Sequence, residues 1–269
     1  EIDTIRFEYD SLEAFSNFVN DVRFSFRVLP SKVTLQDFKA FIPTFENFKE
    51  ELHIELKTGG NINQLECPSI SIYSGNHFFL RGAISLQDLS RPKDAFVFGH
   101  LTNLYADPEG VDFFVRNLSK HYNGVPPAIK NMGTISFSGE ISGYFNELVT
   151  YGKVKTNVGS VQTDVKLISN REKGLFAYSG DIKTNNFKLG KMLSNNKLGD
   201  VTLNLKVNGN HYINQYPSII MKGLISSIDY SSYTYENITL DGAYKQGGFT
   251  GKAALDDTNG SILVNGNIN

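Results

Sequence analysis

Residues 219–225, IIMKGLI, and residues 238–244, ITLDGAY, carry the sequence pattern that decides the fold. Both stretches alternate apolar residues with other residues and place a glycine within the apolar series. Successive side chains of a β-strand point to opposite faces, so the apolar residues and the glycine share one face. In the second stretch the other face carries Thr239 and Asp241. Each stretch is therefore predicted to be a strand with one continuous apolar face, which includes the glycine.

The same pattern recurs along the chain and predicts a sheet of about a dozen or more strands. A glycine on the apolar face permits a kink or bulge, and its repetition favours a sheet that bends around that face. The intervals between the glycines are irregular, which excludes a solenoid of fixed period. We expect a mainly-β protein with a curved, elongated, groove-shaped sheet, an apolar concave face and short helical insertions. The further matches are residues 80–84, 135–141, 176–182, 205–211 and 262–268.

Three helical insertions interrupt the strand pattern. Residues 34–51 place phenylalanines at helical spacing, with Pro43 expected to break or kink the helix. Residues 107–121 open with an Asp-Pro-Glu sequence that is typical of a helix start. Residues 187–193 are predicted to form a short third helix. Residues 11–20 fit either a helix or a strand, and a strand is expected before them.

The composition limits the class of protein. The 269 residues include 26 Lys and Arg against 28 Asp and Glu, a net charge of −2, which argues against a nucleic-acid binder with a basic surface. No apolar stretch has the length of about 18–20 residues that a membrane span needs. The sequence starts at Glu1 without a signal-peptide pattern, so we expect a processed form or a fragment of a longer protein. Residues 1–269 contain no low-complexity linker, which predicts one continuous domain.

Motifs of catalysis and metal binding are absent from the sequence. There is no nucleophile elbow, Walker loop or dinucleotide fingerprint. The single cysteine, Cys67, precedes Pro68 in a predicted turn and is expected to be an inert small residue. Residues 256–260, DDTNG, predict a tight turn rather than a calcium loop. We expect no enzymatic activity, no cofactor and no metal. The histidines are too scattered for a metal-binding pair: His53, His77, His100, His121 and His211.

The apolar face allows three interpretations. It can be the core of a closed β-sandwich scaffold, with a filled interior. It can be an open groove for acyl chains, where burying one CH₂ is worth about 0.8 kcal/mol and ten about 8 kcal/mol before entropy losses. A carbohydrate-binding or hydrolytic β-domain is the third, although the lack of tryptophan weighs against sugar stacking. Strand periodicity does not separate a filled core from a groove.

Four segments in order resemble the TamB proteins of the Bacteroidota, within the wider AsmA-like superfamily. Residues 134–167, TISFSGEISGYFNELVTYGKVKTNVGSVQTDVKL, look like a segment of that family. Residues 185–209, NNFKLGKMLSNNKLGDVTLNLKVNG, are similar to its short helix, L-G and a strand ending in V-x-G. SKVTLQDFKAFIPTF at residues 31–45 and GNHFFLRGAISLQDL at residues 75–89 resemble two upstream segments. The resemblance covers roughly residues 30–269, and its motifs are structural rather than catalytic.

The resemblance implies a translocation and assembly module protein, anchored in the inner membrane, that crosses the periplasm as a taco-like sheet with a hydrophobic interior. The family is linked to outer-membrane biogenesis and phospholipid movement between membranes, and some members work with an Omp85-type outer-membrane barrel. This chain would be an internal periplasmic fragment, with the barrel contacted through regions outside it. A phospholipid or another acyl-chain ligand would be its partner, with no nucleic acid.

The predicted lipid-contacting residues are the apolar members of the strand pattern. Their expected role is contact area, so that no single one is essential and an introduced charge, such as Phe137→Asp or Met221→Arg, stops the passage of lipid. They are Leu80, Ile84, Ile135, Phe137, Ile141, Phe176, Tyr178, Ile182, Leu205, Val207, Ile219, Met221, Ile225, Ile238, Leu240, Ile262 and Val264.

Overall fold

The computed structural model describes residues 1–40, 45–46, 48–91, 93–118, 124–170, 174–212 and 218–268. The chain forms two compact units, which are described separately. Unit 1 comprises Glu1–Val125 and Ser136–Phe145, and unit 2 comprises Pro126–Ile135 and Asn146–Asn269. The single continuous domain stays a prediction.

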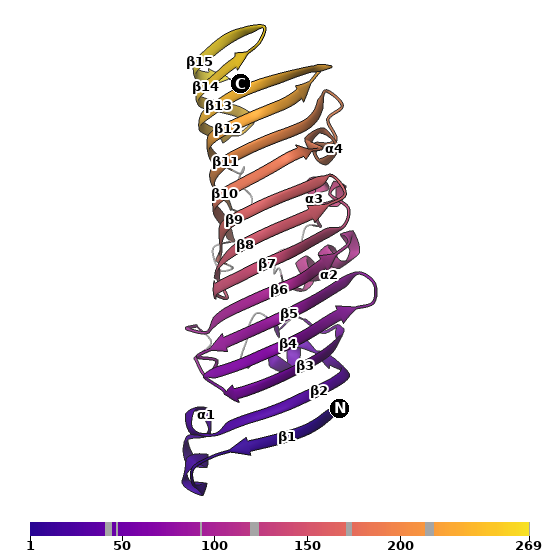
Figure 1. Cartoon of the computed structure of the whole chain (residues 1–269), viewed down its shortest axis with the longest axis vertical. Helices are drawn as coiled ribbons and strands as arrows, with labels where there is room; N and C mark the ends of the chain where they lie inside the picture. Colours follow the sequence, from indigo (N-terminus) through magenta and orange to yellow (C-terminus); the bar gives the residue numbers. More distant parts are fainter. Residues whose placement is uncertain are drawn as a thin grey trace. The chain divides into compact units, whose positions relative to one another are not determined.

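Unit 1 is a meander of strands in sequence order (Figure 1). Neighbouring strands from β1 to β6 pair antiparallel. The strands are β1 Ile2–Glu8, β2 Arg23–Thr34, β3 Glu51–Asn61, β4 Gln64–Ser74, β5 Phe78–Gln87, β6 Phe96–Ala106 and β7 Ile135–Tyr144. The helical elements are η1 Leu12–Asn17, α1 Phe18–Asp21, η2 Leu35–Phe38 and α2 Pro108–Leu118.

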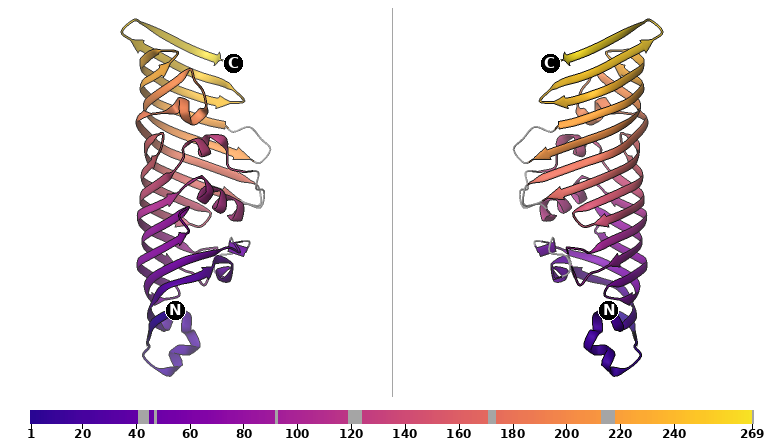
Figure 2. Two further views of the ribbon diagram at one scale, coloured as in Figure 1. Left: turned by 90° about the vertical axis from the view of Figure 1, so that its right-hand side faces the viewer. Right: turned by 90° about the vertical axis from the view of Figure 1, so that its left-hand side faces the viewer.

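Unit 2 continues the same construction, with β8 to β15 paired antiparallel in sequence order. Among the described residues β8 does not pair with β15, so this sheet is open. Figure 2 shows its strands curving, and the prediction of a mainly-β protein with a curved, groove-like sheet is confirmed. The elements are α3 Pro127–Asn131, β8 Glu147–Thr156, β9 Gly159–Asn170, β10 Leu175–Phe187, α4 Leu189–Leu193, β11 Leu198–Tyr212, β12 Ser218–Tyr230, β13 Tyr233–Lys245, β14 Gly248–Asp257 and β15 Gly260–Ile268.

Two strand glycines of unit 2 show why the apolar pattern contains glycine. Gly180 in β10 has φ +148° and Gly223 in β12 has φ +146°, a region that residues with a side chain rarely adopt. A Cβ atom at Gly180 would lie 2.0 Å from the carbonyl oxygen of Asp164, and one at Gly223 would lie 2.3 Å from that of Asn204. At both positions the neighbouring strand occupies the space of a side chain.

The structure corrects part of the helix prediction. Helix α2 matches the prediction for residues 107–121 as far as Leu118, and α4 matches that for residues 187–193, except that Phe187 ends strand β10. The predicted helix over residues 34–51 is wrong in extent, because η2 is a single 3₁₀ turn between two strands and β3 begins at Glu51. Residues 41–44 and 47 of that prediction lie outside the described residues.

Two shorter segments complete the comparison with the sequence. The structure resolves the ambiguity of residues 11–20 in favour of helix, as η1 followed by α1, and the strand expected before them is β1. Helix α3 was not predicted. Its N-terminal Pro127 follows Pro126, and a proline at the first helical position is a known helix start.

Helix α2 docks on the apolar face of unit 1 through aromatic rings. The Phe114 ring centroid lies 4.2 Å from that of Phe78 on β5 and 5.5 Å from that of Phe48. Phe48 also meets Phe113 at 5.0 Å, edge to face, and is 0% exposed. Aromatic contacts of this kind add stability beyond the area they bury, so they fix the helix on the sheet.

A polar clamp holds the start of α2. The Asp107 carboxylate accepts a hydrogen bond from the Gly110 backbone N–H at 2.8 Å, as expected for a helix N-cap. The same carboxylate lies 2.8 Å from His77 Nδ1, and the Glu109 carboxylate lies 3.3 Å from His77 Nε2. His77 belongs to the β4–β5 connection, so the clamp ties that connection to the helix.

We expect the pKa of His77 to lie above its ordinary value of 6.5, first because of its hydrogen bond to Asp107 and then because of the Asp107 and Glu109 charges. Since the folded-state pKa is the higher one, the clamp contributes fully below the unfolded-state pKa, and that contribution is lost as pH rises through the folded-state value. An NMR titration of the His77 ring measures the shift. Asp107→Asn, which keeps an N-cap residue, is expected to return the pKa toward 6.5, and an unchanged value would contradict this assignment.

A small core covers one end of strands β8 to β11 in unit 2. Val158, Phe187 and Val201 are almost fully buried and form its centre. Leu189 and Met192 of α4 pack against them. The Asn131 side-chain amide of α3 donates to the Met192 carbonyl oxygen at 2.9 Å, which joins the two short helices. The apolar side chains at this end of the strands are therefore packed against the short helices.

Candidate functional site

The apolar face of unit 2 consists of cross-strand rows. Directly paired residues of neighbouring strands lie on the same face of a sheet, so the register defines each row. The rows continue across strands from β10 to β15 without a charged residue. One row is Ile182, Leu205, Gly223, Leu240, Ala253 and Val264, the next is Leu203, Ile225, Ile238, Leu255 and Ile262, and a third is Gly180, Val207, Met221, Gly242, Gly251 and Gly266.

The predicted contact residues of unit 2 share this face. Tyr178 pairs with Gly209, which pairs with Ile219, so the fourth row is aligned with the other three. Phe176 begins a fifth row opposite His211. Ile135, at the start of β7, belongs to unit 2 by its contacts and is half-buried. Apart from Ile135, these predicted residues therefore lie on a common face, as the alternation of the sequence predicted without knowledge of the register.

Burial varies across this face. Leu205 and Val207 are buried, whereas Phe176 is 45% exposed and Ile262 is 58% exposed. The remaining predicted residues of unit 2 are half-buried. Of the two exposed positions, Phe176 lies near the start of β10 and Ile262 lies on the last strand, β15.

The opposite face of unit 2 is charged. Lys206 Nζ lies 3.5 Å from Asp181 Oδ2, and Lys222 Nζ lies 2.7 Å from Asp241 Oδ2. These four residues form a single cross-strand row and are all largely exposed. Exposed pairs of this kind contribute little stability each. The row carries the charge of this face, which also presents the exposed apolar side chains of Ile220 and Leu224.

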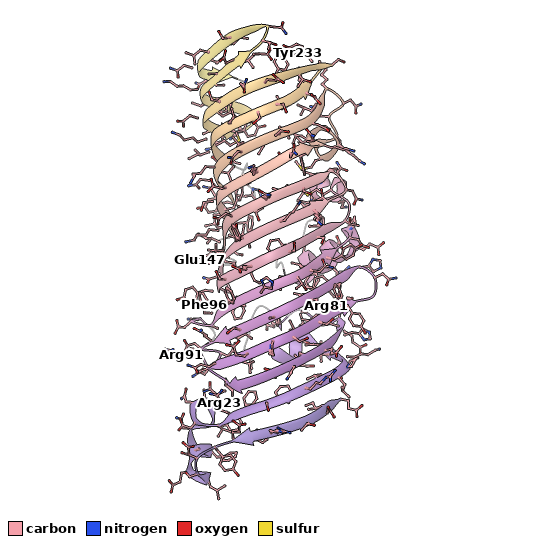
Figure 3. All side chains as sticks on the ribbon, viewed as in Figure 1. Arg23, Arg81, Arg91, Phe96, Glu147 and Tyr233 are labelled. Atoms are coloured by element: carbon pink, nitrogen blue, oxygen red, sulfur yellow. The ribbon has the colours of Figure 1, made fainter. Side chains whose placement is uncertain are left out.

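Unit 1 has an apolar face of the same construction. Ile72, Leu80 and Leu104 form one cross-strand row, and Ile70, Gly82 and Leu101 form the next. Cys67, Ile84 and Gly99 form a third. The Ile141 side chain of β7 lies over Gly99, where a Cβ atom would be 2.9 Å from its Cγ1 atom, and Phe137 is 8% exposed. The opposite face carries Arg81, whose guanidinium carbon lies 5.1 Å from the Phe79 ring centroid (Figure 3).

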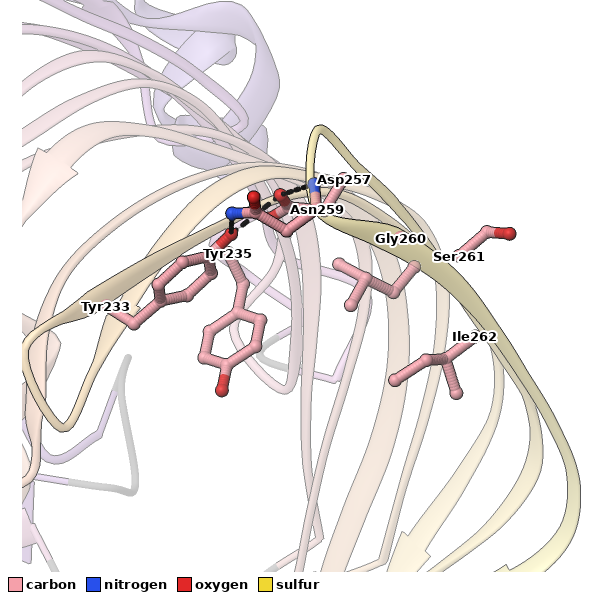
Figure 4. A pocket seen from close by; sticks show the side chains of 8 residues that line it. Tyr233, Tyr235, Asp257, Asn259, Gly260, Ser261 and Ile262 are labelled. Atoms are coloured by element: carbon pink, nitrogen blue, oxygen red, sulfur yellow. Dashed lines mark hydrogen bonds between the residues drawn. The ribbon is translucent and has the colours of Figure 1, made fainter.

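An open cavity of about 310 Å³ lies over the last three strands of unit 2, β13 to β15 (Figure 4). No motif in the sequence predicted this cavity. Its aromatic part is Tyr233 and Tyr235, with ring centroids 4.6 Å apart. Two tyrosines at alternate positions of a strand would have indicated a shared surface, but the turn that faces them was assigned only a structural role. The cavity is lined by Tyr233, Tyr235, Leu255, Asp257, Asn259, Gly260, Ser261 and Ile262.

The prediction that Cys67 lies in a turn is wrong. This residue lies within β4, at a register shift between Cys67 and Ile70, and its side chain is buried. A bulge tolerates the missing N–H of Pro68, which explains how the strand continues. Burial raises the pKa of the Cys67 thiol. A buried thiol with a raised pKa is poorly suited to act as a nucleophile.

No group of three or more histidine, cysteine, aspartate or glutamate side chains is arranged to hold a metal ion within the described ranges. In the same part of the chain, no helix combines the length and the apolar character needed to cross a membrane. The predicted tight turn at residues 256–260 is confirmed, since it joins β14 directly to β15.

Comparison with protein-family models, with curated proteins and with solved structures finds no match for this chain.

Proposed function

We propose that this protein is a non-enzymatic segment that shields acyl chains of phospholipids, or of similar amphiphiles, on the apolar face of its open sheet. The observation that carries the proposal is the set of uncharged apolar rows across the strands of unit 2, opposite a row of charges. An acyl chain needs apolar area and few polar contacts. A set of half-buried side chains offers this area without a dedicated polar site.

The resemblance to the TamB proteins supports a cellular setting for this activity. In that setting the protein works in the periplasm, as part of a chain anchored in the inner membrane. It takes part in phospholipid transport between the inner and outer membranes and in outer-membrane biogenesis. An Omp85-type barrel would be reached through regions outside this sequence.

A second candidate function is a closed scaffold that docks other envelope proteins. The buried cluster of Val158, Phe187 and Val201 favours it, because a filled interior leaves no room for a ligand. The exposed Phe176 and Ile262 favour the acyl-chain function instead, since a filled core would bury them.

Mass spectrometry of lipids released from the purified protein separates the two functions. We expect phospholipids or fatty acids to be retained through purification. Washing the protein with an excess of an apolar competitor should lower the number of lipid molecules retained per protein molecule. A preparation with no retained lipid, which also fails to take up added fatty acid, would contradict the acyl-chain function and support the scaffold.

A further inference from the structure

The cavity near the C-terminal end of unit 2 combines an apolar half with a polar half (Figure 4). Leu255 and Ile262 are direct cross-strand partners, and Ile238 pairs with Leu255 on the other side. The cavity thus opens from the same apolar rows that we propose to hold acyl chains. A chain lying on these rows would reach the cavity without crossing a polar surface.

The polar half is organised around one carboxylate. Tyr233 Oη donates to Asp257 Oδ1 at 2.7 Å, and the backbone N–H groups of Asn259 and Glu236 donate to the same carboxylate at 3.1 and 3.2 Å. Asn259 Nδ2 donates to Tyr233 Oη at 2.5 Å. These bonds fix the carboxylate and the Tyr233 ring in one arrangement, which is a requirement for a selective site.

The charge of this arrangement favours a cation. Hydrogen bonds from Tyr233 and from backbone N–H groups lower the pKa of Asp257, so the group is ionised at neutral pH. None of the ion pairs found among the described residues includes Asp257. Tyr233 and Tyr235 line the cavity with their rings packed edge to face, and aromatic π-faces attract ammonium groups. No cationic side chain lines the cavity.

We propose that this cavity binds the ammonium head of an acyl amphiphile, with the acyl chain lying along Leu255, Ile262 and Ile238. This inference rests on the proposed acyl-chain function and adds a preference among ligands. The carboxylate and the aromatic pair select a cationic or zwitterionic amine head over an anionic head. The apolar half accepts any saturated chain, so the preference is set by the head alone.

The test compares two amphiphiles with the same chain, decyltrimethylammonium and decyl sulfate, below their micelle concentrations. Titration calorimetry on the full chain is expected to show about tenfold tighter binding of the ammonium compound. Asp257→Asn should bring the two affinities close to equality. Asp241→Asn makes the same charge change on the opposite face, so it should leave the ratio of affinities unchanged.

A second pair of variants tests the cavity without altering the β14–β15 turn, in which Asp257→Asn could disturb the fold. Tyr235→Leu keeps apolar area but loses the π-face, and is expected to lower the ammonium preference, whereas Tyr235→Phe should retain it. Equal affinities for both amphiphiles in the unaltered protein would overturn the cavity assignment, as would a ratio that neither Asp257→Asn nor Tyr235→Leu changes. If a photo-cross-linking amino acid at position 221 still captures a fatty acid in that case, only this inference fails. Failure of both amphiphiles and of fatty acids to bind would overturn the proposed function as well.

Discussion

Replacing Gly180 with alanine is expected to lower the free energy of unfolding by about 3 kcal/mol or more. Two costs combine at this position. The backbone at φ +148° costs a residue with a side chain about 1–3 kcal/mol. The new Cβ atom would also lie 2.0 Å from the Asp164 carbonyl oxygen, which is part of the β9–β10 ladder and cannot shift without weakening that pairing. Against a typical total stability of about 5–15 kcal/mol, this loss is large.

Urea unfolding followed by circular dichroism measures the effect, and Gly59→Ala is the matched control. Gly59 lies in strand β3 without a positive φ, and its Cβ atom would make only an ordinary contact, 3.6 Å from Ser25 Cβ. The control is expected to be neutral or to stabilise by less than about 1 kcal/mol, because alanine restricts the unfolded chain. Equal midpoints for Gly180→Ala and the unaltered protein would show that these glycines do not set the path of the sheet.

Met221→Arg is expected to weaken the binding of a fluorescent fatty acid at least tenfold. Met221 is half-buried on the apolar face between Val207 and Gly242, so the guanidinium would lie in the path of the acyl chain. Bringing an acyl chain over an unpaired charge removes water from that charge and costs several times the gain from one CH₂. The loss appears in a fluorescence titration of the folded variant.

The control for this variant is Ile220→Arg, on the same strand. Ile220 is also apolar, is 52% exposed and lies on the opposite face, so the same charge there should leave fatty-acid affinity unchanged. Equal effects at the two positions would contradict a face-specific site. Phe137→Asp is a poorer test, because Phe137 is buried and a charge there is expected to unfold unit 1 before it reports on binding.

The sequence was sufficient to predict the faces of strands in which buried and exposed residues alternate, such as β8 and β12. It did not predict the antiparallel pairing, although short connections impose it. Ser231 and Ser232 both adopt positive φ between β12 and β13, and a Ser-Ser pair is not a recognised hairpin sequence. Cys67 was wrongly assigned to a turn because the sequence did not indicate the bulge that accommodates Pro68 within strand β4. The tyrosine cavity was missed because it depends on three strands whose register the sequence does not specify.

Photo-cross-linking decides where an acyl chain lies on this protein. A benzophenone amino acid is placed at one position at a time, at Met221 and Ile238 on the apolar face and at Ile220 and Leu224 on the opposite face of β12. Each folded variant is exposed to a radiolabelled fatty acid and illuminated. The acyl-chain function predicts strong labelling at the first two positions and background labelling at the other two. Equal labelling of both faces, or labelling of neither, would contradict it.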